Sequence, residues 1–248
     1  MIEIVSVHID KTAGMLFCDV LKQVYGSSQV HVIWKGQATY KFDDKLKEPI
    51  PPQTRVIHGA FPVSHYEGRF IDAKRIVWVR DPIERLISYY FYILGNHLLF
   101  PNGLEEMSLL EFAAHPQNCN KMLQMIGSLE KFYFVGIQEF VLDDLYQLRN
   151  LLEWPAFEIK PINTNPFPNY QEEKKVILGN RQLISQLESL NKEDIKLYQD
   201  ALKLRENRLK TSRLRFLTNM KTELSRSRLK LKQTQSELNL PAFPIGKS

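Results

Sequence analysis

The first 25 residues constrain the fold more than any other part of this chain. Residues 2–8 (IEIVSVH) form a β-rich apolar run, a short loop containing Gly14 follows at once, and residues 15–25 have helical spacing. A strand that leads through a tight loop into a helix is the first half of a βαβ unit. The N-terminus therefore predicts a parallel sheet with helices packed on its faces.

The rest of the chain repeats this alternation. Further strands are expected at 30–34, 54–58, 74–79 and 132–135. Helices are expected at 82–94, 108–114, 119–127 and 141–152, and the pattern is helical again from about 172, with a break near 189–192. We therefore predict an α/β fold: a P-loop-like central parallel sheet flanked by helices, with a long basic C-terminal helix. The length of 248 residues fits an α/β domain over 1–190, a helical extension over 191–240 and a tail over 241–248.

The positive charge of the chain is concentrated in one segment. Residues 203–232 contain eleven Lys or Arg residues and two Glu residues, whereas the rest of the chain holds 22 bases and 26 acids. This distribution argues against a generally basic nucleic-acid binder. The segment could bind an anionic partner, mediate self-association or lie as a solvated arm on the acidic body. Leu217, Leu224, Leu231 and Leu238 recur every seven residues, which favours a continuous helix and leaves a coiled coil open.

Cysteine usage and hydropathy exclude further classes of protein. Cys18 and Cys119 are the two cysteines of the chain, which argues against a disulfide scaffold and a structural zinc cluster. No apolar run approaches the ~20 residues that span a bilayer, and the N-terminus has no basic stretch typical of a signal peptide. We expect no transmembrane segment and a cytoplasmic location.

The loop His8-Ile9-Asp10-Lys11-Thr12-Ala13-Gly14 is the first candidate site. A tight turn between a strand and a helix directs backbone N–H groups and the helix dipole outward, which favours an anion. Lys11 adds a positive charge and Thr12 a hydroxyl, although a solvated loop with a turn glycine is an equally simple interpretation. Asp10 occupies the position of the Walker A glycine, which disfavours an ordinary P-loop ATPase.

The segment from Arg80 to Ser88 is the second candidate site. Arg80 follows a buried-type strand, and Asp81, Pro82 and Glu84 form a strong helix start in which Glu84 is expected to close a capping box. Helical spacing lets Arg80 and Ser88 clasp one phosphate. The alternative is an ion network of Arg80 and Arg85 with Asp81 and Glu84 that stabilises the helix start, and Arg85 is assigned to that network.

Together these two motifs resemble those of the PAPS-dependent sulfotransferases. The similarity is to the carbohydrate branch, which includes the heparan sulfate 2-O-sulfotransferases and their bacterial relatives. Residues 8–14 resemble its 5′-phosphosulfate loop (H-I-P-K-T-A-G-T-S), and residues 80–88 resemble its 3′-phosphate motif (R-D-P-x-x-R-x-x-S). Residues 134–139 resemble a later strand and turn (F-V-G-x-x-E), and residues 191–198 a terminal helix start (N-x-x-D-x-x-L-Y). The resemblance covers about residues 1–200.

The resemblance implies transfer of a sulfuryl group from PAPS, the sulfate donor, to a hydroxyl of a carbohydrate acceptor. It implies that Lys11 neutralises the oxygen that bridges sulfate and phosphate. The N–H groups of Thr12, Ala13 and Gly14 would hold the 5′-phosphate. Arg80 and Ser88 would hold the 3′-phosphate. The chemistry requires no metal.

Several positions depart from the family pattern. Asp10 replaces the usual Pro, and Met15 and Leu16 replace the usual Thr-Ser pair. The relatives carry a His-Gly-His segment whose second histidine is the expected general base, and Ala60 stands at that position. We therefore predict His58 as the base, because an acceptor hydroxyl needs a proton acceptor within hydrogen-bond reach.

Other residues are candidates for the base or for the acceptor site. His65 and Glu139 are the next candidates for the base after His58, and His8 is interpreted as structural. Asn163, Thr164 and Asn165 lie in a Pro-rich loop that could meet the acceptor or only form turns, and Tyr89 to Tyr92 are expected in the core.

Two other function classes remain open. The loss of the expected base at Ala60 leaves a catalytically degenerate PAP(S)- or glycan-binding protein possible. The topology leaves a nucleotide kinase possible, although the missing Walker glycine disfavours it.

Overall fold

The computed structural model describes residues 1–33, 50–96, 107–159 and 165–211. The chain divides into two compact units, Met1–Leu202 and Lys203–Ser248. The first unit contains the sheet described below. Of the second unit, residues 203–211 are described and are helical. The heptad leucines from Leu217 onward lie outside the described residues.

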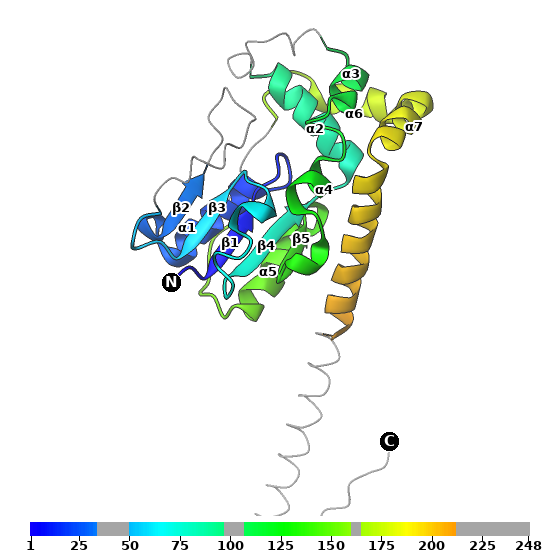
Figure 1. The fold of residues 1–248 in the computed structure, drawn as a ribbon. Coiled ribbons are helices and arrows are strands. Elements are labelled where there is room, and N and C mark those ends of the chain that lie inside the picture. The colour runs from blue at the N-terminus through cyan, green and yellow to red at the C-terminus, as the bar shows by residue number, and fades with distance from the viewer. Residues whose placement is uncertain (34–49, 97–106, 160–164, 212–248) are drawn as a thin grey trace, which may run out of the picture. The chain divides into compact units, whose positions relative to one another are not determined.

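Five parallel strands form the centre of the first unit (Figure 1). Their order is β2-β3-β1-β4-β5, and every neighbouring pair is parallel. The bounds are Ile4–Val7 for β1, Val30–Ile33 for β2, Val56–Gly59 for β3, Lys74–Val79 for β4 and Phe134–Ile137 for β5. The first strand lies in the middle, with β3 on one side and β4 on the other. A ligand crevice is expected beyond the carboxyl ends of such central strands.

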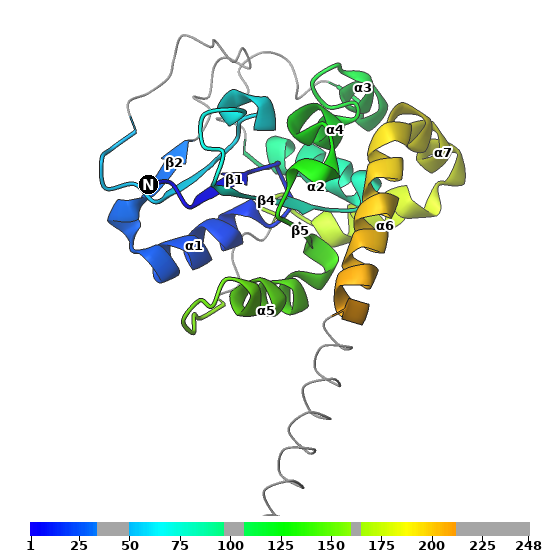
Figure 2. The ribbon, with the colours of Figure 1, turned by 60° about the horizontal axis from the view of Figure 1, so that its bottom comes forward.

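Helices cover both faces of the sheet (Figure 2). On one face, side chains of α1 (Gly14–Tyr25) and α5 (Val141–Leu151) pack on Ile4, Ile76 and Trp78. On the other face, α4 (Lys121–Ile126) packs on alternate strand residues, as do Leu197 and Ala201 of the C-terminal helix, which begins at residue 192. Successive strand side chains point to opposite faces, so both faces are apolar and buried.

A third apolar cluster lies beside the sheet and is entirely helical. It joins α2 (Pro82–Leu94), α3 (Leu109–Ala114) and α7 (Arg181–Leu190), with α6 (Tyr170–Gly179) packed at its edge. Short 3-10 turns at Ser27–Gln29, Val63–Tyr66, Leu129–Lys131 and Gln138–Phe140 connect the other elements. This helical layer brings α2 and the start of α6 to the carboxyl edge of the sheet, where the candidate site lies.

The predicted α/β fold with a central parallel sheet and flanking helices is confirmed. The predicted strands and helices begin and end within a few residues of the observed ones. One helix boundary was missed: the helical pattern after 172 contains a break at Asn180, whose Oδ1 accepts a hydrogen bond from Leu183 N (3.1 Å) and caps α7.

The motif at 191–198 joins the C-terminal helix to the start of α4 through hydrogen bonds. Asp194 is fully buried and accepts hydrogen bonds from Met122 N (2.9 Å) and Leu123 N (2.8 Å), the first turn of α4. Asn191 Oδ1 accepts from Asn120 N (3.1 Å), and Asn120 Oδ1 accepts in return from Asp194 N (3.1 Å). The described contacts of Asn191 and Asp194 are structural.

Candidate functional site

A cavity of about 970 Å³ opens at the carboxyl edge of the sheet. Its walls come from the loop after β1, from β4 and α2, from the turn after β5, and from residues 165–172. The lining residues are His8, Asp10, Lys11, Ala13, Gly14, Met15, Leu16, Arg80, Ser88, Tyr92, Gln138, Val141, Asn165, Phe167, Asn169, Tyr170, Gln171 and Glu172. The cavity therefore brings together the two motifs that were separated by about 70 residues in the sequence.

The loop after β1 has the backbone geometry of an anion site. Lys11 and Ala13 adopt positive φ angles of 65° and 67°, with Thr12 between them. Thr12 Oγ1 donates to Ile9 O (2.9 Å) and holds the turn, so the Thr12 hydroxyl supports the loop and does not line the cavity. No side chain caps α1, and the residues of its first turn line the cavity. Backbone N–H groups and the helix dipole thus favour an anion there.

Gly14 is required because His8 packs directly on it. A Cβ atom at position 14 would lie 1.6 Å from His8 Nδ1. The sequence indicated a turn glycine at this position. In the structure, the immediate neighbour of Gly14 is the imidazole of His8, which also lines the cavity.

Lys11 reaches across the cavity toward α2. Its Nζ lies 4.1 Å from the centroid of the Tyr92 ring, a cation–π contact. Burial, followed by the charge of Arg80, lowers the pKa of Lys11 to about 8, and the charge of Asp10 opposes this shift. Lys11 is therefore mostly protonated at neutral pH and close to its titration range.

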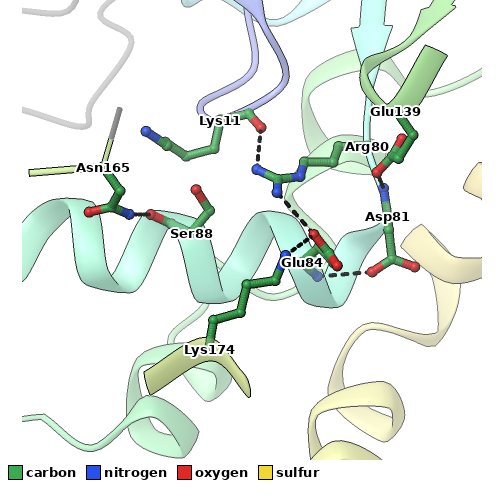
Figure 3. Close-up of polar contacts among 8 residues, drawn as sticks. All are labelled: Lys11, Arg80, Asp81, Glu84, Ser88, Glu139, Asn165 and Lys174. Atoms are coloured by element: carbon green, nitrogen blue, oxygen red, sulfur yellow. Dashed lines mark hydrogen bonds and ion pairs between the residues drawn. The ribbon is translucent and has the colours of Figure 1, made fainter. Parts of the chain in front are cut away.

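Arg80 is held in the cavity wall by two hydrogen bonds (Figure 3). Its Nη1 donates to Lys11 O (3.3 Å) and its Nη2 donates to Glu84 Oε2 (3.1 Å). The buried Nε of Arg80 has no hydrogen-bond partner within the described part of the chain. Arg80 thus couples the loop after β1 to α2, and it lines the cavity.

Glu84 lies between two cations. Lys174 of α6 donates to the same carboxylate oxygen as Arg80. Burial alone would raise the pKa of Glu84, but the hydrogen bonds and charges of Lys174 and Arg80 outweigh it and lower the pKa. The carboxylate is therefore ionised at neutral pH and links α6 to the cavity wall.

Ser88 lies one helical turn further along α2, on the side that faces Lys11 and Arg80 (Figure 3). Its carbonyl accepts a hydrogen bond from Asn165 Nδ2 (3.0 Å), which fixes the loop before α6. Tyr92 continues this face at the next i, i+4 position and also lines the cavity. Sequence reasoning placed Tyr92 in the core, although its spacing from Ser88 could have identified it.

Two predicted contacts of the helix start are wrong. Asp81 caps α2 as expected, since Glu84 N donates to Asp81 Oδ1 (2.9 Å), but Asp81 N donates to Glu139 Oε1 (3.0 Å), so Glu84 does not close a capping box. Arg85 does not join the ion network with Asp81 and Glu84. Its side chain is fully buried, and Nη2 donates to Asn118 O (3.5 Å).

His58 does not line the cavity. Its side chain is 1% exposed, and Nδ1 forms a 2.9 Å hydrogen bond with Ser6 Oγ. Burial, followed by electrostatic repulsion from His8 and Lys22, lowers the pKa of His58 well below its ordinary value. His58 is therefore enclosed in the sheet, where an acceptor hydroxyl in this cavity does not reach it.

The remaining site residues proposed from the sequence lie at different places in the fold. His65 packs on Phe61 and Tyr66 away from the cavity, and Glu139 binds the backbone at Asp81. Asn165 lines the cavity, whereas Asn163 and Thr164 lie outside the described residues. Over the described ranges there is no cluster of three or more side chains that could hold a metal ion. Nor does any helix in these ranges combine the length and the apolar character needed to cross a bilayer.

Comparison with known proteins agrees with the two motifs. Residues 2–123 match the model of a family described as the sulfotransferase family. This segment includes both the loop after β1 and the Arg80–Ser88 motif. No curated protein sequence matches the chain. The match supports a sulfotransferase family for this chain.

Proposed function

Starting from the match of residues 2–123 to a sulfotransferase family, we propose that the chain transfers a sulfuryl group from PAPS to a hydroxyl of a carbohydrate acceptor. The observation that carries this proposal is the meeting of two anion-binding features in one cavity. The uncapped start of α1 lies in the same wall as Arg80 and Ser88. A donor with phosphates at both its 5′ and 3′ positions needs two such features.

The loop after β1 would hold the 5′-phosphosulfate end. Ala13 and Gly14 line the cavity, and their N–H groups and the first turn of α1 supply the positive end of the helix dipole. Lys11 would neutralise the charge that develops on the oxygen between phosphorus and sulfur as the bond to sulfur breaks. As in phosphoryl transfer, positioning and charge stabilisation supply most of the catalysis.

Arg80 and Ser88 would hold the 3′-phosphate. A guanidinium group and a hydroxyl offer directed donors to phosphate oxygens, and charge-assisted hydrogen bonds of this kind are stronger than neutral ones. The carboxylate of Glu84 holds Arg80 in place from outside the cavity. A nucleotide without a 3′-phosphate would leave these donors unused.

The cavity fits such a donor in size and in chemistry. Its volume of about 970 Å³ is at the upper end of ordinary small-molecule sites, which leaves room for a donor and part of an acceptor. Met15 and Leu16 lack the hydroxyls found in relatives, but their backbone N–H groups belong to the uncapped turn of α1. The amide of Asn169 and the ring of Tyr170, which also line the cavity, are groups that suit a sugar.

A calorimetric titration tests the donor site. We expect tight binding of PAP and much weaker binding of 5′-AMP and ATP. Arg80→Ala should weaken PAP binding by about 10- to 100-fold, the effect of losing a hydrogen bond to a charged group. The exposed Arg181→Ala variant, outside the cavity, should bind PAP as the wild type does. Equal affinity for PAP and 5′-AMP would refute the 3′-phosphate site.

The burial of His58 and the alanine at position 60 favour a second candidate, a degenerate PAP(S)- or glycan-binding protein. This protein would bind PAP in the same titration but would not release sulfate from PAPS with any acceptor, water included. Sulfate release therefore separates the two candidates.

A further inference from the structure

We propose that His8 is the catalytic base of the transfer reaction, acting through Nε2, and that Asp10 is its positioning residue. This inference rests on the proposed function, because it assigns a proton acceptor to the same cavity. Sequence reasoning interpreted His8 as structural and assigned the base to His58. The geometry reverses these two roles.

Access to the cavity is the first argument. Lys11 lines the cavity but is mostly protonated at neutral pH, and the other lining side chains of the described residues that could accept a proton are His8, Asp10, Tyr92, Tyr170 and Glu172. Phenols keep their proton at neutral pH, and carboxylates are weak bases. An imidazole is the group whose basicity suits general-base catalysis near neutral pH. This leaves His8 as the base of suitable strength.

The orientation of the ring is the second argument. The Nδ1 edge of His8 packs on Gly14, where a Cβ atom would lie 1.6 Å away. The other nitrogen, Nε2, lies 3.9 Å from Asp10 Oδ1, and Asp10 also lines the cavity. Because residue 14 has no side chain, the ring of His8 can pack against it by Nδ1, and Nε2 lies on the side of Asp10.

The electrostatics of the site suit this role. Burial lowers the pKa of His8, the charge of Asp10 raises it and the charge of Lys11 lowers it again, so the net direction is downward. His58, whose ring centroid lies 5.6 Å away on β3, is a further titratable neighbour of His8. The imidazole is therefore neutral at pH 7. Once it accepts a proton, the carboxylate of Asp10 stabilises the imidazolium.

The proton and electron balance of the step is simple. The O–H proton of the acceptor moves to His8 Nε2, and the electron pair of that bond forms the new bond from oxygen to sulfur. The bond from sulfur to the bridging oxygen breaks, and its electron pair stays on the 5′-phosphate. Lys11 supplies the positive charge for that oxygen. Asp10, which replaces the usual Pro of the loop, acquires a role as the counter-charge of His8.

Histidine NMR at varied pH tests the pair without any turnover. The imidazole resonance that disappears from the spectrum of His8→Gln belongs to His8. In the wild type, this resonance should titrate below the ordinary pH range of histidine. In Asp10→Asn the same resonance should titrate at lower pH still, because the raising influence of Asp10 is gone. A midpoint unchanged by Asp10→Asn would refute the positioning role of Asp10.

Sulfate release from PAPS with water as acceptor tests the base. His8→Gln should keep PAP affinity in calorimetry and lose about 100-fold or more in turnover, the usual contribution of a general base. The wild-type profile of kcat/KM should rise with pH through the lowered pKa of His8 and fall near pH 8 as Lys11 loses its proton. His8→Gln should lose the acid limb and keep the alkaline one.

Two matched variants give the controls. His58→Gln and His31→Gln each remove a histidine that does not line the cavity, and both should keep the acid limb. Full turnover or an intact acid limb in His8→Gln, or no sulfate release by a wild type that binds PAP, would overturn the inference. A wild type that does not bind PAP would instead refute the proposed donor site.

Discussion

The pKa of Lys11 leads to a direct prediction about donor binding. With a pKa of about 8, the ammonium group is ~90% populated at pH 7 and ~10% populated at pH 9. If the neutral amine does not bind the donor, the apparent affinity for PAP falls ~10-fold over this range. The sign follows from the lowered pKa, since the bound anion needs the protonated form, which is lost as pH rises.

Calorimetry with PAP at pH 7, 8 and 9 measures this effect. Phosphate monoesters have a second pKa near 6, so the ligand is already ionised across this interval. Lys11→Arg is the matched control, because a guanidinium stays charged throughout and should bind PAP with constant affinity. A wild-type change below twofold, or the same fall in Lys11→Arg, would show that Lys11 does not titrate in the donor site.

Three further predictions concern the support of the site. Asp194→Ala should destabilise the fold by about 3–5 kcal/mol in urea unfolding, because it removes two buried backbone contacts and a buried counter-charge. Gly14→Ala should lower the free energy of unfolding by about 1–3 kcal/mol, because the new methyl group displaces the ring of His8. The NMR resonance of His8 should shift in this variant. Tyr92→Leu should move the alkaline fall of PAP affinity to lower pH by about half a unit, because the cation–π contact with Lys11 favours its charged form.

The strands were predictable because each is a short apolar run bounded by turn residues. The pattern of residues 2–25 correctly predicted the succession of β1, its loop and α1. Asp81 and Pro82 correctly predicted the start of α2. The break at Asn180 was missed, although Gly179 and Asn180 are ordinary stop and cap residues. Local patterns thus identified most elements, because each depends on its own residues.

Partners of charged side chains were less predictable. Arg85 and Glu84 were both assigned to the helix start on the basis of spacing along one helix. In the folded chain Arg85 lies near Asp194, over 100 positions later, and Glu84 binds Lys174 of α6. These contacts depend on how α6 and the C-terminal helix return to α2, which no local spacing reveals.

The choice between the two histidines depended on strand register. In the pairing of β1 with β3, Ser6 lies opposite His58 and Val7 opposite Gly59. His8 N donates to Gly59 O (2.7 Å), so His8 lies two residues beyond the level of His58, toward the carboxyl edge. At about 3.3 Å per residue this is a step of about 7 Å, enough to separate a ring that does not reach the cavity from one that lines it. The same register puts His8 level with Ala60. At the carboxyl edge of the sheet, β3 is therefore followed by an alanine and β1 by a histidine.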